Sequence, residues 1–410
     1  MKISHACRLL FFSTLFVLFA LPAAAQLTAL ENLGKALYFD KSLSSPSNMS
    51  CASCHDERVG FTGAKPNINR TGAVYPGAER QRFGNRRPPT AAYAGESPIF
   101  QYDPAEGLFV GGMFWDGRAT GWVTGDPLAD QAMGPFLNPV EHNLPSEYSA
   151  CAIVARSNYV GLYEEIYGPL DCNSYDGEHL TAYIDFANAI AAFERSQEIS
   201  AFDSKFDSVM AGEAEFTAQE EHGWELFNGK AQCSACHPAP LFTDFTYDNL
   251  GVPENPDNPF YEMDTVYVDG EPINPAGGAW IDPGLAGFLE SLPPEWFAEQ
   301  GLDKATVTKG NYGKHKVPTL RNADKRPGPG FAKAYMHNGT FKSLEEVVAF
   351  YNDRDELIAM GLLVPEVMDN MNQDELGALG LSFEEEAALV AFMKTLSDGY
   401  LPAKGSGRGR

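Results

Sequence analysis

Basic residues are scarce in this chain, which has 30 Lys and Arg against 55 Asp and Glu and a formal net charge of −25. A surface of this sign repels nucleic acid and anionic lipid and favours basic partners, unless the acidity serves solubility alone. Long apolar runs are also lacking, because no segment after residue 25 approaches the length needed to span a bilayer. Nucleic-acid binding and membrane insertion are therefore excluded from the expected functions.

The first 25 residues differ from the rest and have the pattern of a secretory signal peptide. Lys2 and Arg8 provide a basic start, residues 9–21 form an apolar run too short to span a bilayer, and three alanines end at Ala25. We expect residues 1–25 to be a signal peptide cleaved near Ala25, and the protein to be exported to the periplasm.

Cysteine is sparse as well, with seven in the chain and six after residue 25. Four of the six form two copies of one motif: Cys51, Cys54 and His55 in "CASCH", and Cys233, Cys236 and His237 in "CSACH". The other two, Cys151 and Cys172, could pair as a disulfide in an oxidising compartment. The sequence does not decide whether they do.

The C-x-x-C-H spacing is typical of covalent haem attachment, in which two thiols bind the haem vinyl groups and the histidine ligates the iron. A zinc site would need further Cys or His ligands, and a redox dithiol needs no histidine and belongs in a βαβ setting. Each motif instead follows a helical segment, and export suits c-type maturation. We therefore predict two covalently bound c-type haems, with His55 and His237 as iron ligands.

The surroundings of the two motifs repeat as well, which predicts a mainly α fold of two tandem cytochrome c-like domains with long irregular loops. Thr217 and Glu220 form a capping-box pattern, so the helix before the second motif should begin near Ala218. Helical patterns at 180–209 should link the domains, and the Pro- and Gly-rich residues 251–294 should be irregular. The expected boundaries are 26–200 for the N-terminal domain, 201–400 for the C-terminal domain and 401–410 for a flexible tail.

Four further segments occur in a characteristic order: "MFWDGRATGWVTGDPLADQAMGPFLNPVEH", "KVPTLRN", "AYMHNG" and "SLEEVVAFY". Together with the C-x-x-C-H motifs they resemble the bacterial di-haem cytochrome c peroxidase and MauG superfamily over nearly all of the chain after residue 25. The resemblance implies an enzyme that reduces hydrogen peroxide at the His55 haem. It also implies that electrons pass through the His237 haem from a periplasmic cytochrome, a copper protein or a protein substrate.

The same resemblance assigns roles in the N-terminal half. Glu141 matches the distal acid that moves a proton on bound peroxide, and Gln131 matches its hydrogen-bonding neighbour. Pro135 and Pro139 lie between these two residues, so they should not share one continuous helix. Trp115 matches a tryptophan between the two haems. Without the resemblance, Glu141 would be interpreted as a solvated loop acid and Trp115 as a core aromatic.

The ligand on the other face of the first haem divides the family. Ordinary peroxidases carry a histidine between the first motif and the tryptophan, and it leaves the iron when the second haem is reduced. This chain has no histidine between His55 and Trp115, and the next one is His142. The first haem should therefore be five-coordinate or water-bound, as in the MauG branch.

At the second haem, the family ligand lies fourteen residues after the histidine of "AYMHNG", which is a methionine in the peroxidases and a tyrosine in MauG-like proteins. Counting from His337 gives Tyr351. Ser343 should cap a helix with Tyr351 on its inner face. Alternatively, Tyr351 is a core residue and Met360 or Met336 binds the iron. A phenolate would lower the haem potential and favour oxidised iron.

Two positions depart from the family pattern. A calcium ion commonly lies between the haems, but the asparagine that binds it matches Arg87 here, with Asn85 two residues early, so calcium has little support. MauG has a tryptophan where this chain has Ala231, so maturation of an amine dehydrogenase is not assigned. The alternatives are a peroxidase that needs reductive activation, a non-catalytic di-haem electron-transfer cytochrome, or a redox sensor.

Overall fold

The computed structural model describes residues 26–401 of the chain. The predicted signal peptide and nearly all of the predicted tail lie outside this range. The predicted fold class is confirmed, because helices dominate and the sheets in the described range are four antiparallel pairs of short strands. Within residues 26–401, no helix is both long and apolar enough to cross a membrane.

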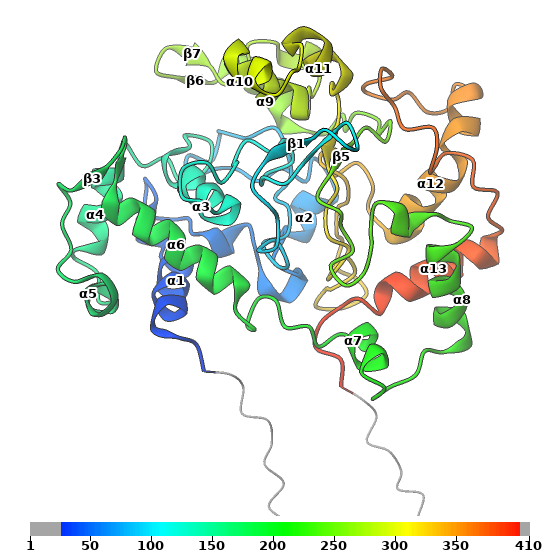
Figure 1. The fold of residues 1–410 in the computed structure, drawn as a ribbon, viewed down its shortest axis with the longest axis horizontal. Coiled ribbons are helices and arrows are strands. Elements are labelled where there is room, and N and C mark those ends of the chain that lie inside the picture. Colours follow the sequence, from blue (N-terminus) through cyan, green and yellow to red (C-terminus); the bar gives the residue numbers. More distant parts are fainter. Residues whose placement is uncertain (1–25, 402–410) are drawn as a thin grey trace, which may run out of the picture.

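The helices and strands are short and are separated by long connections (Figure 1). The helices are α1 (Ala29–Phe39), α2 (Pro66–Asn69), α3 (Pro127–Leu137), α4 (Glu147–Val154), α5 (Val160–Tyr167), α6 (Thr181–Arg195), α7 (Lys205–Met210), α8 (Ala218–Asn228), α9 (Leu285–Ser291), α10 (Pro294–Glu299), α11 (Lys304–Gly310), α12 (Leu344–Ala359) and α13 (Phe383–Lys394). The strands pair in the order β1 (Gln101–Asp103) with β2 (Leu108–Val110), β3 (Tyr175–Asp176) with β4 (His179–Leu180), β5 (Tyr247–Asp248) with β8 (His315–Lys316), and β6 (Tyr267–Val268) with β7 (Glu271–Pro272).

The first core forms where α1 and α3 pack against α6. At the crossing of α1 and α6, Gly34 lies so close to the partner helix that a Cβ atom would be 1.9 Å from the carbonyl oxygen of Ala189. Glycine is therefore needed there for close backbone approach. The disulfide Cys151–Cys172, left open by the sequence, joins α4 to the segment after α5.

The second core repeats this arrangement with α8 and α13, on the opposite side of the molecule in Figure 1. Gly223 of α8 meets Ala388 of α13 in the same way, with a Cβ position 2.0 Å from the carbonyl oxygen. The predicted start of α8 is confirmed, because Thr217 and Glu220 form the expected capping box. Helices α1 and α8, which precede the two C-x-x-C-H motifs, are thus both positioned by a glycine at a close helix crossing.

The connections differ in part from the sequence-based expectations. Helix α6 belongs to the first core and α7 contributes Phe206 to the second, so residues 196–204 form the connection between them. Residues 251–294 are not wholly irregular, since they contain the β6–β7 hairpin and α9. Leu285 and Leu289 of α9 are buried against Phe100 and Tyr247, which explains why this short helix forms in a Pro- and Gly-rich region.

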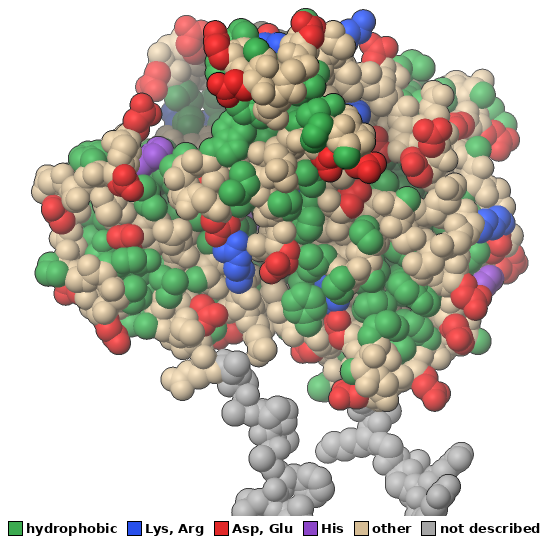
Figure 2. Space-filling view, viewed as in Figure 1, with side chains coloured by type: hydrophobic (Ala, Val, Ile, Leu, Met, Phe, Trp, Pro, Cys, Tyr) green, Lys and Arg blue, Asp and Glu red, His purple; other side chains and the backbone are tan. Residues whose placement is uncertain are grey.

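The surface agrees with the composition. Acidic side chains are scattered over the face shown in Figure 2, where basic side chains are few. We find no feature on this face that suggests a nucleic-acid site.

Candidate di-haem site

Two cavities each contain one C-x-x-C-H motif. The first cavity is lined by Cys51, Cys54 and His55, and the second by Cys233, Cys236 and His237. Each motif begins in a single 3-10 turn, Cys51–Ser53 or Cys233–Ala235, in which the histidine N–H donates to the carbonyl of the first cysteine. This turn brings both sulfurs and the imidazole to one cavity wall.

All four motif cysteines are free thiols. None of the four forms a disulfide, and burial raises the pKa of the Cys54, Cys233 and Cys236 thiols to about 12. Among residues 26–401, no further Cys, His or carboxylate group joins either motif in an arrangement that would hold zinc. The residues therefore fit thioether attachment of a haem and not a zinc site.

The two motif histidines are prepared for iron in the same way. His55 Nδ1 lies 3.0 Å from the carbonyl oxygen of Phe61, and His237 Nδ1 lies 2.8 Å from that of Phe242. Both phenylalanines have a left-handed backbone with φ of 55°. Because a carbonyl can only accept, Nδ1 carries the proton and Nε2 is left as the ligand atom. Burial lowers the pKa of both histidines, which keeps the imidazoles neutral.

Gln131 and Glu141 both line the first cavity. Gln131 lies on α3, whereas Glu141 follows the end of that helix, so the expectation that they share no continuous helix is confirmed. Pro135 lies inside α3 rather than at its end, and it removes the N–H that would bond the Gln131 carbonyl. Asn138 Nδ2 donates to Glu141 Oε1 at 2.8 Å, which leaves Oε2 available. Burial raises the pKa of Glu141 against the lowering effects of Arg118 and Asn138.

A second buried carboxyl in the first cavity was missed from the sequence. Glu194 on α6 lines the cavity, and its Oε2 has no hydrogen-bond partner among the described residues. Burial raises the pKa of Glu194 to about 8. The available signal was its position on the apolar face of α6, one turn after the buried Ile190.

His142 also lines the first cavity, next to Glu141. Its Nδ1 lies 2.7 Å from the carbonyl oxygen of Leu43, and burial lowers its pKa to about 4. Among the described residues, His55 and His142 are the histidines that line this cavity. Any protein nitrogen ligand opposite His55 would therefore have to be His142.

Trp115 is buried and lines both cavities, as do Arg87, Pro89 and Thr90. The indole Nε1 of Trp115 donates to the carbonyl oxygen of Arg87 at 3.0 Å, and the Arg87 guanidinium lies 5.4 Å from the indole ring. The two cavities therefore share a wall that contains the buried Trp115 ring and the partly buried Arg87 cation.

The Arg87 guanidinium donates only to uncharged oxygens: Met336 O, Pro88 O and Thr62 Oγ1. Burial lowers its pKa to about 10. A partly buried cation without a carboxylate partner fits a site whose ligand brings its own anionic groups, as haem does with its two propionates.

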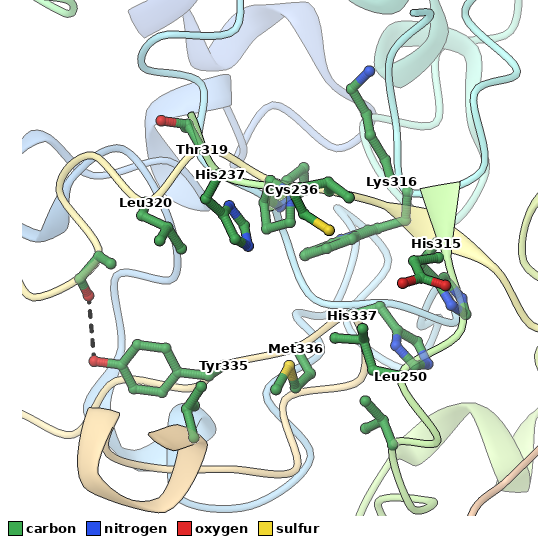
Figure 3. A pocket seen from close by; sticks show the side chains of 18 of the residues that line it. Cys236, His237, Leu250, His315, Lys316, Thr319, Leu320, Tyr335, Met336 and His337 are labelled. Atoms are coloured by element: carbon green, nitrogen blue, oxygen red, sulfur yellow. Dashed lines mark hydrogen bonds between the residues drawn. The ribbon is translucent and has the colours of Figure 1, made fainter. Parts of the chain in front are cut away.

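The second cavity contains two of the three candidate axial ligands. Tyr351 and Met336 line it, while the Met360 side chain is 60% exposed and does not. Figure 3 shows Met336 across this cavity from His237. The predicted cap of α12 is confirmed, because Ser343 accepts from the Glu346 N–H. Burial raises the pKa of the Tyr351 phenol above its usual value, so only a cation such as ferric iron would ionise it.

Two tandem helical units, two covalent haem motifs and a shared tryptophan wall define a di-haem c-type protein. The carboxyls of Glu141 and Glu194 in the first cavity suit the proton transfers of a peroxidase-type oxidoreductase. The chain matches the family model "Di-haem cytochrome c peroxidase" over residues 28–215. The methylamine utilization protein MauG of Paracoccus denitrificans is 34% identical over 390 residues, which is 90% of this chain and 89% of MauG. The chain belongs to the di-haem cytochrome c peroxidase and MauG family, and it is an enzyme with two c-type haems.

Two other relatives agree with this assignment. Cytochrome-c peroxidase IdrP1 of Denitromonas iodatirespirans is 30% identical over 89% of this chain and 80% of its own. The crystal structure of the diheme peroxidase BthA from Burkholderia thailandensis superposes with a TM-score of 0.70 at 26% identity, covering 92% of this chain and 87% of BthA.

Proposed function

We propose that this enzyme reduces hydrogen peroxide in the first cavity without prior reductive activation, and that the second cavity passes electrons from a protein partner. The partner is a small periplasmic cytochrome, a copper protein or a protein substrate, as the MauG-like ligand set suggests. Residues 1–25 support export to the periplasm.

A haem held by Cys51, Cys54 and His55 would supply the redox-active iron that peroxide reduction needs. Glu141 Oε2 then removes a proton from one peroxide oxygen and delivers it to the other, which leaves as water. The Gln131 amide orients the peroxide and the carboxyl group. Two electrons and two further protons complete the conversion of one hydrogen peroxide to two waters.

The raised pKa of Glu141 supports this role, because burial brings the carboxyl closer to the pH at which it can both take and give a proton. Glu194 is a second proton holder on the same cavity, with a pKa of about 8. It can supply protons that the overall reaction consumes. We assign direct proton transfer on peroxide to Glu141, since it matches the distal acid of the family and lines the first cavity together with Gln131.

The observation that carries the proposal is the histidine content of the first cavity. The loop from residue 56 to residue 114 has no histidine, so the histidine that ordinary peroxidases carry there is missing, and the His142→Ala variant below tests the other histidine on this cavity. The face opposite His55 is then open to peroxide in the resting enzyme. In the second cavity, Tyr351 as phenolate would stabilise oxidised iron and make that haem a store of oxidising equivalents.

The test is an optical and EPR comparison of the ferric protein before and after hydrogen peroxide, with no reductant present. We expect a high-spin first haem and a peroxide-induced change at both haems. Glu141→Gln should slow this change about 10²- to 10⁴-fold and leave the resting spectrum largely intact. Two low-spin haems that ignore peroxide would refute the proposal. A low-spin first haem that becomes high-spin in His142→Ala would identify His142 as its ligand and also refute it.

A second candidate is an ordinary cytochrome c peroxidase, which Met336 favours by lining the second cavity. Its thioether would give that haem a high potential and make it the site of electron entry. In that case the peroxide reaction should appear only after one haem has been reduced.

A further inference from the structure

Asp282, His315, His337 and Glu366 form a buried cluster at one end of the second cavity. Figure 3 shows His315 and His337 side by side, away from Cys236 and His237. One ligand atom from each of Asp282, His315 and His337 can be chosen so that all three lie within 4.8 Å of one another. Glu366 Oε2 lies 3.7 Å from His337 Nε2.

Both imidazole rings present an unused nitrogen to this cluster. The Nε2 atoms of His315 and His337 are buried and have no hydrogen-bond partner among the described residues. His315 Nδ1 lies 3.0 Å from the carbonyl oxygen of Gly313 and so carries the proton, which leaves a lone pair on Nε2. The His337 side chain is only 7% exposed, so water cannot readily satisfy its Nε2 atom.

Hydrogen bonds hold the carboxylates of Asp282 and Glu366 in place. Arg86 donates to both oxygens of Asp282 at 2.7 and 2.6 Å, and it also binds Asp116. Glu366 Oε1 accepts from the Asp282 N–H at 2.8 Å, which leaves Oε2 directed at His337. This arrangement holds ligand atoms in place as outer hydrogen bonds do around protein metals.

The cluster has more carboxylates than nearby basic side chains to balance them. Arg86 is shared by Asp116 and Asp282, and Arg118 assists only at Asp116. The Glu366 side chain is 5% exposed, and no lysine or arginine in the described range pairs with it. A buried carboxylate needs a compensating positive charge, because desolvation of an isolated anion is costly. The missing charge and the two unused nitrogens point to the same kind of ligand.

We propose that Asp282, His315, His337 and Glu366 bind one divalent transition-metal ion of the Zn²⁺ or Cu²⁺ type, separate from the haem irons. Imidazole with carboxylate suits these ions, whereas Ca²⁺ and Mg²⁺ prefer oxygen ligands alone. Neighbouring ligands of a tetrahedral zinc lie about 3.4 Å apart for bonds of about 2.0–2.1 Å. Asp282 Oδ2 lies 3.3 Å from His315 Nε2 and 4.0 Å from His337 Nε2, so the distances from this carboxylate to the two nitrogens are already close to that spacing.

Binding also requires the two imidazoles to leave their present stack. Their ring centroids are 3.6 Å apart and the planes differ by 10°, so the two lone pairs run side by side. Rotation of the side chains makes them converge on one ion. The His337 ring lies 6.5 Å from that of Trp115, so the bound charge adjoins the wall shared by the cavities. The ion should therefore raise the reduction potential of the second haem.

The experiment uses the mature di-haem protein, stripped with EDTA and checked for two irons per chain by elemental analysis. Zn²⁺ alone is then added and the excess removed by gel filtration. We expect one zinc retained per chain, and at least a tenfold loss of affinity in His315→Ala and Glu366→Gln. His222→Gln is the matched control, because His222 is an exposed histidine on α8 far from the cluster in sequence. Wild-type protein that retains no zinc, or variants that bind it as wild type does, would overturn the proposal.

A second measurement keeps the test valid if a variant folds poorly. In wild-type protein, Zn²⁺ should raise both the melting temperature and the midpoint potential of the second haem, while Ca²⁺ at the same concentration should change neither. Equal effects of the two ions would show that the site is an oxygen-type cation site and not the one proposed. No effect of either would show that protonated histidines alone balance the carboxylates.

Discussion

The helix crossings that position the haem motifs depend on glycine, and Gly34→Ala tests this directly. The added Cβ would lie 1.9 Å from Ala189 O and 2.9 Å from Phe193 Cβ. Ordinary contacts are more than 1 Å longer, so α1 would have to move away from α6. Overpacking of this kind typically costs about 1–3 kcal/mol, and a backbone atom on the partner helix cannot rotate aside, so we expect the upper end.

Gly161→Ala is the matched control. Gly161 is also inside a helix, α5, but nothing lies within 4 Å of its Cβ position. That substitution should stabilise by up to about 1 kcal/mol through helix propensity alone. For a unit of this size, each kcal/mol changes the melting temperature by about 2–4 °C. Gly34→Ala should therefore melt about 5–10 °C lower, and Gly161→Ala should melt at or above the wild-type temperature.

The assay is thermal unfolding of the di-haem protein, followed by absorption of each haem. Because Gly34 lies before the first motif and Gly223 before the second, each alanine variant should mainly disturb its own haem. If Gly34→Ala and Gly223→Ala both melted at the wild-type temperature, the close helix crossings would not require glycine, and the argument from backbone contact would be wrong. Separate melting of the two haems would also support the predicted division at residue 200.

The remaining predictions concern the two cavities. Glu194 has a pKa raised to about 8 by burial, so the folded state binds the proton more tightly than the unfolded state does, and stability should fall as pH rises from about 4.5 to 8. The loss is on the order of 5 kcal/mol, and Glu194→Gln should remove most of it; an unchanged difference in melting temperature between pH 5 and pH 8.5 would contradict this. Tyr351→Phe should keep both haems but change the spectrum and raise the potential of the second, whereas Met336→Leu should change neither. The opposite pattern would identify Met336 as the ligand.

Much of the haem attachment was predictable because its residues are local in sequence. The spacing of Cys51, Cys54 and His55 fixes their joint placement in one turn. The starts of α8 and α12 were predictable from capping pairs three residues apart, Thr217 with Glu220 and Ser343 with Glu346. Helical periodicity also predicted the face of α12 that carries Tyr351 into the second cavity. In each case the signal and the structure lie within one or two helical turns.

The rest depends on contacts between distant segments, which a single sequence does not specify. Asp282, His315 and His337 come from three segments that are distant in the sequence: the loop before α9, strand β8 and the segment before α12. Glu194 resembles any polar residue near a helix end until the opposite wall of the cavity is known. Helix α9 is short and weakly periodic, and tertiary burial of its leucines decides its formation.

The loop between the first motif and Trp115 bears on whether the enzyme needs activation. In ordinary peroxidases this loop carries a histidine that leaves the iron, so the loop must move. Here three buried or partly buried hydrogen bonds join it to the C-terminal half: Lys333 Nζ donates to Val59 O at 2.9 Å, Asn69 Nδ2 to Ala332 O at 2.9 Å, and Arg87 Nε to Met336 O at 2.6 Å.

The Arg87 guanidinium is charged, whereas burial lowers the pKa of the Lys333 amine well below its usual value. A hydrogen bond to a charged group contributes about 1.5–3 kcal/mol, and leaving the buried Lys333 amine without its acceptors carries a further cost. Moving the loop would break several such bonds at once without releasing any histidine from the iron. The fastening of this loop is therefore better suited to a peroxide site that is already open in the resting enzyme than to one that opens on reduction.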